Sequence, residues 1–285
     1  RDRLRSRGLG DVYKRQNLLL FLKEKRRIED IAIADLDKKF IEDYYNWMLG
    51  TCALASSTAF CRVNTLKWLM YTAQERGWIR LHPFIGFNCL PEYRRRSFLT
   101  EEDLQSIIHV KLKYKRQRAI RDMFLFMCFT GLAYADLKEI TYKNIHTDSD
   151  GGTWLMGNRI KTGVAYVVKL LPIAIELVEK YRGDNEKKSS PDKVFPVGEY
   201  QAMVSSLRVL TRICGCSTGI TPHIGRHTFA VLAILKGMPL ETLQKVLGHK
   251  SILSTQIYAE LINPKVGEDT DRLCMKIGDT YRLAN

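Results

Sequence analysis

The strongest candidates for chemistry lie between residues 221 and 258. Residues 221–227 read Thr-Pro-His-Ile-Gly-Arg-His, and they begin as a helix does, with Thr221 as the capping residue and Pro222 in the first turn. His223 and Arg226 are then i, i+3 neighbours at a helix N-terminus, where backbone N–H groups favour a phosphate. An imidazole that moves a proton beside a guanidinium that binds phosphate oxygens suits phosphoryl transfer. Taken alone, such a pair is more often two polar residues at a helix start.

Three further side chains could complete such a site. A helix is expected to end at Gly248, and His249 follows it. Ser251 then begins a short helix that carries Tyr258, although a tyrosine in this position is more often a core aromatic with a bonded hydroxyl. Lys161 lies in an expected β-hairpin, where a lysine is most often solvated, but a lysine held near a leaving oxygen could protonate it.

Composition indicates a folded protein with a polyanionic partner. The 285 residues hold 45 Lys+Arg against 31 Asp+Glu, for a formal net charge of +14, and this surplus favours nucleic acid. A hydrophobic fraction of 45% and an aromatic fraction of 10% exclude disorder as the dominant state. The longest apolar run, residues 123–129, is far shorter than the roughly 20 residues of a membrane helix, so no membrane partner is expected. Seven cysteines without C-x-x-C spacing argue against a disulfide framework or a zinc site and favour a cytoplasmic setting.

The first sixteen residues are interpreted as a non-native leader. They are rich in arginine without hydrophobic periodicity, and residues 11–16 read like the translation of a sequencing adapter. Their six basic and two acidic residues account for +4 of the net +14, so the remainder carries +10 and the polyanion argument holds. A genuine basic arm on DNA is the alternative. Asn17 starts abruptly in an apolar run, which suggests that the first helix has been truncated.

Residues 17–90 are expected to form a helical domain. Apolar residues repeat at helical spacing up to Gly50, and a second helix after Ser56 carries a clear apolar stripe. Proline and glycine residues followed by three arginines mark a linker over residues 91–97. Basic side chains that lie off the stripe or in the linker are candidate DNA contacts: Arg62, Lys67, Arg94, Arg95 and Arg96.

Residues 98–285 are expected to form a second domain. Residues 100–103 read like a capping box at a helix start, and a basic stretch over residues 111–121 precedes an apolar helix. Between residues 140 and 171 the apolar period shifts toward strands, with turn residues at 148–152 and 162–163. The chain is therefore expected to be mainly α with a small antiparallel β-sheet.

Taken in order, several short strings resemble the tyrosine recombinase (phage integrase) family, and the integrases of Bacteroides-type mobile elements most. The resemblance covers residue 17 to the C-terminus, and the joint order and spacing of the strings are far more specific than any one of them. The strings are Thr130-Gly131-Leu132 with Asp136-Leu137, Arg159 to Thr162, Val194-Phe195-Pro196, His223 to Ala230, Leu247-Gly248-His249 and Tyr258-Ala259.

The resemblance implies a role for each candidate residue. Tyr258 would be the nucleophile, Arg226 and His249 would bind the scissile phosphate, His223 would assist proton transfer and Lys161 would be the general acid for the 5′ oxygen. The implied enzyme is a site-specific recombinase that cuts and rejoins DNA through a 3′-phosphotyrosyl intermediate, without metal, ATP or cofactor. Its implied fold is a helical, SAM-like core-binding domain followed by a catalytic domain, clamped around double-stranded DNA. A homotetramer on paired sites and accessory DNA-bending proteins are the implied partners.

One position departs from the family pattern. Most members have an arginine directly after Thr-Gly-Leu, where this chain has Ala133. Three interpretations follow: an inactive enzyme, a sequencing error, or a replacement arginine elsewhere. Arg159 is the best substitute, because it lies two residues before Lys161 and strand alternation would place both side chains on one face. The first alternative is a DNA-binding regulator of the same fold that is catalytically impaired. A more distant alternative is an enzyme like a type IB topoisomerase, which uses a similar tyrosine mechanism.

Overall fold

The computed structural model describes residues 15–90, 97–185 and 192–260, and the leader and the three linker arginines lie largely or wholly outside these ranges. The chain divides into two compact units, residues 1–94 and 95–285. Each has its own hydrophobic core, as expected for two domains. In the described residues, no helix is long and apolar enough to cross a membrane.

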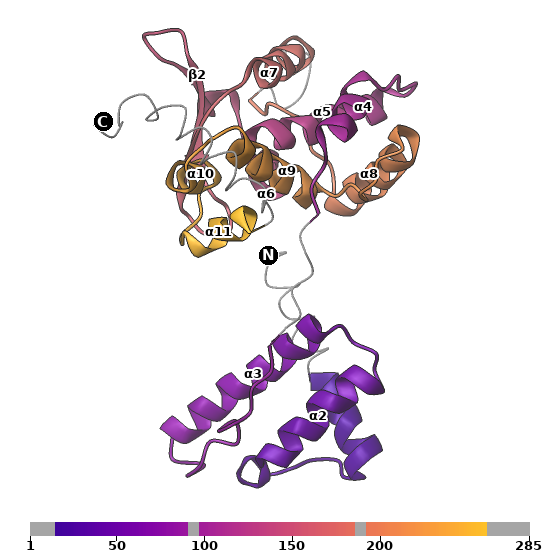
Figure 1. The fold of residues 1–285 in the computed structure, drawn as a ribbon, viewed down its shortest axis with the longest axis vertical. Helices are drawn as coiled ribbons and strands as arrows, with labels where there is room; N and C mark the ends of the chain where they lie inside the picture. Colours follow the sequence, from indigo (N-terminus) through magenta and orange to yellow (C-terminus); the bar gives the residue numbers. More distant parts are fainter. Residues whose placement is uncertain (1–14, 91–96, 186–191, 261–285) are drawn as a thin grey trace, which may run out of the picture. The chain divides into compact units, whose positions relative to one another are not determined.

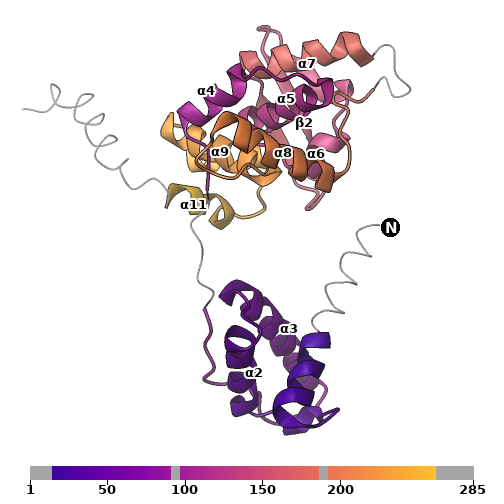
Figure 2. The same ribbon diagram turned by 90° about the vertical axis from the view of Figure 1, so that its right-hand side faces the viewer.

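The N-terminal unit is helical (Figures 1 and 2). A helix over residues 15–21 runs into a π-helical turn, Leu22–Arg26, and a 3-10 turn follows at Ile33–Asp35. Helix α2 (Lys38–Gly50) begins where the Asp37 carboxylate accepts a hydrogen bond from the Phe40 N–H at 2.6 Å. Helix α3 (Ser56–Glu75) packs against α2 through the expected stripe. The buried residues of that stripe are Ala59, Val63, Leu66, Met70 and Ala73.

The C-terminal unit is built around two buried helices, α5 (Lys115–Thr130) and α9 (Pro222–Leu235), which pack against each other. Both are apolar nearly all round over much of their length, which is the pattern of a helix enclosed by its neighbours. A Cβ added to Gly225 would lie 3.2 Å from Phe124 and Met127, so the small residue permits this close packing. The other helices of the unit are α4 (Glu101–His109), α6 (Tyr134–Glu139), α7 (Pro172–Asn185), α8 (Tyr200–Cys214), α10 (Leu240–Leu247) and α11 (Leu253–Ala259).

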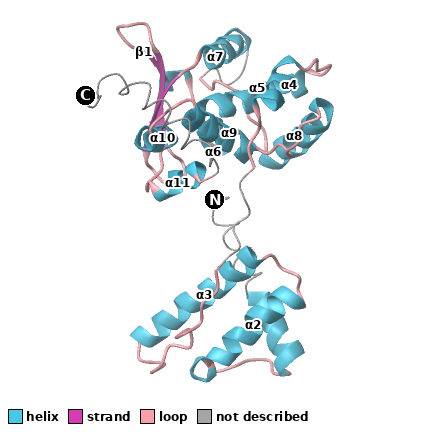
Figure 3. Ribbon diagram, viewed as in Figure 1, coloured by secondary structure: helices cyan, strands magenta, loops and turns pink. Residues whose placement is uncertain are grey.

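Three short strands form the expected antiparallel sheet in the order β1-β2-β3 (Figure 3). They are β1 (Ile145–Thr147), β2 (Thr153–Asn158) and β3 (Ala165–Lys169). Leu155 pairs with Val168, and both side chains are buried, so one face of the sheet covers the core and the other is largely exposed. The unit is thus mainly α with a small antiparallel sheet, which confirms the fold class.

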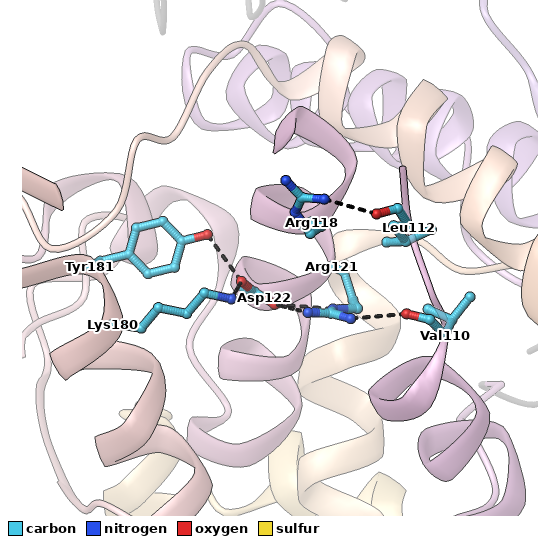
Figure 4. A network of polar contacts seen from close by, with 7 residues as sticks. All are labelled: Val110, Leu112, Arg118, Arg121, Asp122, Lys180 and Tyr181. Carbon is cyan, nitrogen blue, oxygen red and sulfur yellow. Dashed lines mark hydrogen bonds and ion pairs between the residues drawn. The ribbon is translucent and has the colours of Figure 1, made fainter. Parts of the chain in front are cut away.

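Part of the basic stretch at residues 111–121 is used inside the fold (Figure 4). The Asp122 carboxylate on α5 is buried and pairs with Arg121 at 2.9 Å and with Lys180 on α7 at 2.6 Å. The Tyr181 hydroxyl donates to the same carboxylate at 3.2 Å. Arg118 and Arg121 also donate to the carbonyl oxygens that precede α5. These two arginines therefore fix the start of α5, and they are not simply available for DNA.

Two helix starts test the capping predictions. The Thr100 hydroxyl accepts from the Asp103 N–H at 3.1 Å and the Asp103 carboxylate accepts from the Thr100 N–H at 3.3 Å, so the capping box is confirmed. At α9, Pro222 occupies the first turn as expected, but the Thr221 side chain makes no capping hydrogen bond within the described chain. Proline lacks the N–H and the backbone has the extended conformation of a helix entry, so this start relies on backbone geometry.

Candidate active site

Helix α9 presents three of the site's side chains from its first two turns. His223 is exposed at the helix start, whereas Arg226 and His227 are only 3% and 8% exposed. His223 and His227 are i, i+4 neighbours, and their ring centroids lie 4.9 Å apart. The start of α9 therefore places the Arg226 guanidinium in the interior and the two imidazoles side by side, His223 at the surface and His227 buried.

The Arg226 guanidinium is held by two backbone carbonyls from distant parts of the chain. Its Nη1 donates to the Gly131 oxygen and its Nη2 to the Leu247 oxygen, both at 2.7 Å. Burial, with a smaller contribution from the neighbouring Arg159 guanidinium, lowers the pKa of Arg226 to about 10. A cation so far removed from water interacts strongly with any charge that enters beside it.

Arg159 lies next to Arg226 and shares its carbonyl. Its Nη1 donates to the Leu247 oxygen at 2.9 Å, and its Nε lies 2.6 Å from Oδ2 of Asp136. Oδ1 of Asp136 accepts from the Ile160 N–H at 2.8 Å, so this buried carboxylate fixes both the side chain and the local backbone. Two guanidiniums thus converge on one oxygen, with a carboxylate behind one of them.

The strand argument for Arg159 and Lys161 is wrong, although Arg159 does lie at the site. Strand β2 ends at Asn158, and residues 159–164 form the turn, closed by a bond from the Arg159 N–H to the Val164 oxygen at 2.8 Å. Alternation along a strand does not apply there. The Arg159 side chain is 11% exposed and points inward, whereas Lys161 is exposed at the turn.

Two glycines permit this convergence. Gly131 and Gly248 have φ values of +70° and +61°, in the left-handed region that L side chains rarely adopt. A Cβ on Gly131 would lie 2.6 Å from the Phe229 ring, and a Cβ on Gly248 would lie 2.7 Å from Cγ of Arg159. The backbone therefore approaches both arginine-bearing segments more closely than any residue with a side chain would allow.

Tyr258 brings its hydroxyl to this cluster from α11. The residue is 1% exposed, and its oxygen lies 3.0 Å from Nδ1 of His227. The His249 ring is parallel to the phenol at a centroid distance of 6.4 Å, and its Nδ1 bonds the buried Thr255 hydroxyl at 2.8 Å. The short helix thus fixes the tyrosine and, through Thr255, the histidine nine residues before that tyrosine.

The structure therefore brings together most of the expected residues. Tyr258, Arg226, Arg159 and His249 lie in one cluster and His223 borders it, while Lys161 lies in the exposed turn. Ala133 is half-buried and directly precedes α6, two residues after the Gly131 carbonyl that Arg226 contacts.

Two residues of the cluster, Asp136 and His227, were not assigned a role from the sequence. Asp136 belongs to the Asp136-Leu137 string, and His227 directly follows Arg226 in the string from His223 to Ala230. Their positions within these strings were the sequence signal that could have identified them.

The expected DNA contacts of the N-terminal unit are only partly on its surface. Arg62 and Lys67 on α3 are half-buried, and Nη1 of Arg62 is a buried donor without a hydrogen-bond partner within the described residues. Arg94, Arg95 and Arg96 lie outside the described residues.

Comparison with known proteins covers both units. Residues 97–263 match the phage integrase family and residues 6–89 match the phage integrase SAM-like domain, the latter overlapping part of the segment interpreted as a leader. The tyrosine recombinase XerA of Saccharolobus solfataricus is 30% identical over 175 residues, which are 61% of this chain and 56% of that protein. A tyrosine recombinase of Pseudothermotoga lettingae is 24% identical over 282 residues, or 93% of this chain and 90% of that protein.

Solved structures share the fold. A lambda integrase dimer bound to a COC′ core site has a TM-score of 0.67 and 19% identity, over 88% of this chain and 87% of that one. The Tn1549 transposon integrase in complex with a circular intermediate DNA also has a TM-score of 0.67 and 19% identity, over 95% and 97%.

Proposed function

Because this chain belongs to the phage integrase family and is a tyrosine recombinase by that membership, we propose that it cuts and rejoins double-stranded DNA through a covalent bond between Tyr258 and a 3′ phosphate. The observation that carries this proposal is the buried Tyr258 hydroxyl, which lies 3.0 Å from Nδ1 of His227, the residue after the buried Arg226, whose guanidinium shares the Leu247 oxygen with that of Arg159. A phenol has an ordinary pKa of about 10 and is a weak nucleophile until nearby cations stabilise its anion.

The proposed reaction needs the cationic side chains for two purposes. The Tyr258 oxygen attacks phosphorus, and Arg226, assisted by His249, stabilises the charge that builds up on the phosphate oxygens. The bond to the 5′ oxygen then breaks, and Lys161 donates a proton to that oxygen. The exposed turn that carries Lys161 would have to close on the DNA for this step. His223, at the start of α9, assists proton transfer.

The reaction conserves energy in the phosphotyrosyl bond. The 5′ hydroxyl of another strand can attack that bond in the reverse direction, so strand exchange proceeds without ATP, and no metal-dependent step is proposed. Cutting and rejoining therefore use the same residues in opposite order.

Arg159 is proposed to take the place of the arginine that the family usually has at position 133. Its guanidinium donates to the same Leu247 oxygen as Arg226 does, which supports a second phosphate clamp supplied by the β2–β3 turn. This arrangement supports an active enzyme over a catalytically impaired DNA-binding regulator. An enzyme like a type IB topoisomerase would relax supercoiled DNA but would not exchange strands between two duplexes, and this distinguishes it from a recombinase.

The proposed partner is duplex DNA, bound by a homotetramer on paired sites with accessory DNA-bending proteins, in the cytoplasm. The net charge of +14 supports a polyanion, and the DNA complexes of the lambda and Tn1549 integrases support duplex DNA in particular. Arg62 and Lys67 are proposed backbone contacts of the N-terminal unit, together with the linker residues Arg94, Arg95 and Arg96. Such contacts position the DNA without reading its sequence.

The test is capture of a covalent adduct from a pool of duplexes with a randomised centre. Each duplex carries a nick close to the cleavage position, so that the short 5′-hydroxyl fragment diffuses away and rejoining fails. Adducts that survive denaturation are sequenced, and the most frequent sequence serves as the selected duplex for kinetic work. The full chain should form adducts and Tyr258→Phe should form none while binding the pool equally well. Adducts of unchanged yield in Tyr258→Phe would show that another residue is the nucleophile.

A further inference from the structure

The His227 imidazole lies at hydrogen-bond distance from the Tyr258 oxygen, and the reaction above gives it no role. Its Nδ1 lies 3.0 Å from the phenol oxygen, and the two ring centroids are 5.5 Å apart. Both residues are buried, and they come from helices α9 and α11, 31 positions apart in the chain. The contact is therefore a product of the tertiary fold, and it joins a proton acceptor to the oxygen proposed to attack.

The neighbouring guanidinium indicates the direction of this hydrogen bond. The Arg226 guanidinium interacts electrostatically with the Tyr258 hydroxyl, and because a guanidinium has N–H donors and no acceptor, the phenol oxygen can only accept from it. The phenol proton is then best directed at a group that can accept it, and Nδ1 of His227 is at hydrogen-bond distance. In that tautomer the Nε2 atom of His227 carries the ring proton.

We propose that His227 is the general base of the reaction and takes the phenolic proton of Tyr258 as its oxygen attacks phosphorus. The inference rests on the proposed role of Tyr258. As the bond from oxygen to phosphorus forms, the O–H electron pair stays on oxygen and the proton moves to Nδ1, giving an imidazolium. The bond to the 5′ oxygen breaks and that oxygen takes its proton from Lys161. Rejoining reverses both transfers, so the cycle neither consumes nor releases a proton.

The other two histidines of the site are arranged for different tasks. Nδ1 of His249 bonds the Thr255 hydroxyl at 2.8 Å, and the His249 ring lies parallel to the phenol, so this bond fixes the imidazole to α11. His223 is exposed one helical turn before His227, with its ring centroid 4.9 Å away, so it covers the solvent side of the base.

Removing the base while keeping a hydrogen-bond acceptor tests the proposal. In His227→Asn, the amide oxygen can accept from Tyr258 near the former position of Nδ1, but an amide does not take a proton at neutral pH. Single-turnover cleavage of the selected duplex should slow by about 10²- to 10⁴-fold, the usual range for a general base. DNA binding should stay within about twofold. His146→Asn, in which an exposed histidine on β1 is replaced, is the matched control and should cleave at the original rate. Cleavage by His227→Asn at the original rate would overturn the proposal.

A substrate with sulfur in place of the 5′ oxygen separates the base from the acid. A thiolate, unlike an alkoxide, leaves without needing a proton, because a thiol has an ordinary pKa near 8.5. Lys161→Ala should recover most of its rate on this substrate, whereas His227→Asn should stay slow because its defect lies at the nucleophile. Recovery of His227→Asn by the sulfur substrate would overturn the assignment to the nucleophile.

The tautomer of His227 gives a readout that needs no cleavage. Nitrogen-15 NMR of the DNA-free chain, labelled at histidine, should show the His227 signal with the proton on Nε2, and His227→Asn assigns it. That signal should shift in Tyr258→Phe. A proton on Nδ1 would overturn the proposal. Absence of covalent adducts from the unaltered chain would instead overturn the proposed function, whatever the tautomer.

Discussion

Replacing Asp136 by asparagine should cost the C-terminal unit a large part of its stability. The Asp136 side chain is 1% exposed and pairs with Arg159, whose guanidinium lies beside that of Arg226. Asparagine keeps an oxygen that can accept from the Ile160 N–H, so the change removes the charge and little else. Two adjacent guanidiniums are then left without this carboxylate.

The expected loss follows from general values for such pairs. Removing one partner of a buried ion pair costs about 3–5 kcal/mol. For a unit of this size, each kcal/mol shifts Tm by about 2–4 °C, so Tm should fall by about 6–20 °C. Thermal unfolding followed by circular dichroism, with DNA absent, measures this directly.

A double-mutant cycle isolates the ion pair from other effects of the substitution. Adding Arg159→Met to Asp136→Asn removes the unpaired cation and replaces it with an unbranched apolar side chain, so part of the lost stability should return. The interaction energy between the two sites should exceed about 1 kcal/mol. If Asp136→Asn unfolds within 1–2 °C of the original chain, or if the two substitutions are simply additive, the carboxylate does not hold Arg159 as argued.

Four further outcomes are expected. Arg159→Ala should slow cleavage of the selected duplex by about 10²- to 10³-fold, the usual effect of losing one donor to a developing oxyanion, while DNA binding stays almost unchanged. Adding Ala133→Arg to that variant should restore part of the cleavage rate. If Arg159→Ala cleaves at the original rate, Arg226 alone is sufficient to bind the phosphate. Lys161→Ala should slow cleavage of ordinary DNA without altering where the DNA is cut, and gel mapping of the cleavage position checks both. Gly248→Ala should lower Tm by more than Gly215→Ala does. Both residues have a positive φ, so the backbone cost is shared, but an added Cβ contacts Arg159 at Gly248 and nothing within 4 Å at Gly215. Equal shifts in Tm would contradict the close approach of Gly248 to Arg159. The affinity for a fixed duplex, measured by fluorescence anisotropy, should fall steeply as the salt concentration rises. The expected slope is about −0.9 in log affinity against log salt for each phosphate that the protein neutralises. An affinity that does not depend on salt would refute binding through phosphate contacts.

Local patterns predicted local structure well. The capping box at Thr100 and the apolar stripe of α3 depend on residues three or four positions apart, and both formed as expected. The i, i+3 spacing likewise placed His223 and Arg226 at the start of one helix. Such features need no knowledge of the rest of the chain.

Contacts between distant segments could not be predicted in this way. The bond from Arg226 to the Gly131 oxygen joins residues 95 apart, and that from Arg159 to the Leu247 oxygen joins residues 88 apart. Strand alternation correctly predicted that Arg159 lies at the site, but for the wrong reason. Strand β2 ends at Asn158, so Arg159 belongs to the turn, and the turn sets the direction of its side chain. His227 was passed over because its partner, Tyr258, lies on another helix.

The carbonyl oxygen of Leu247 lies between the guanidiniums of Arg226 and Arg159. It accepts from Arg226 at 2.7 Å and from Arg159 at 2.9 Å, so a backbone oxygen of the protein itself holds the two like charges side by side. Each guanidinium has five N–H donors, so this carbonyl uses only part of the hydrogen-bonding capacity of the pair. Leu247 also ends α10, the helix that leads through Gly248 and His249 to the buried Tyr258. The arginine pair and the segment that leads to the tyrosine are therefore joined through one peptide group.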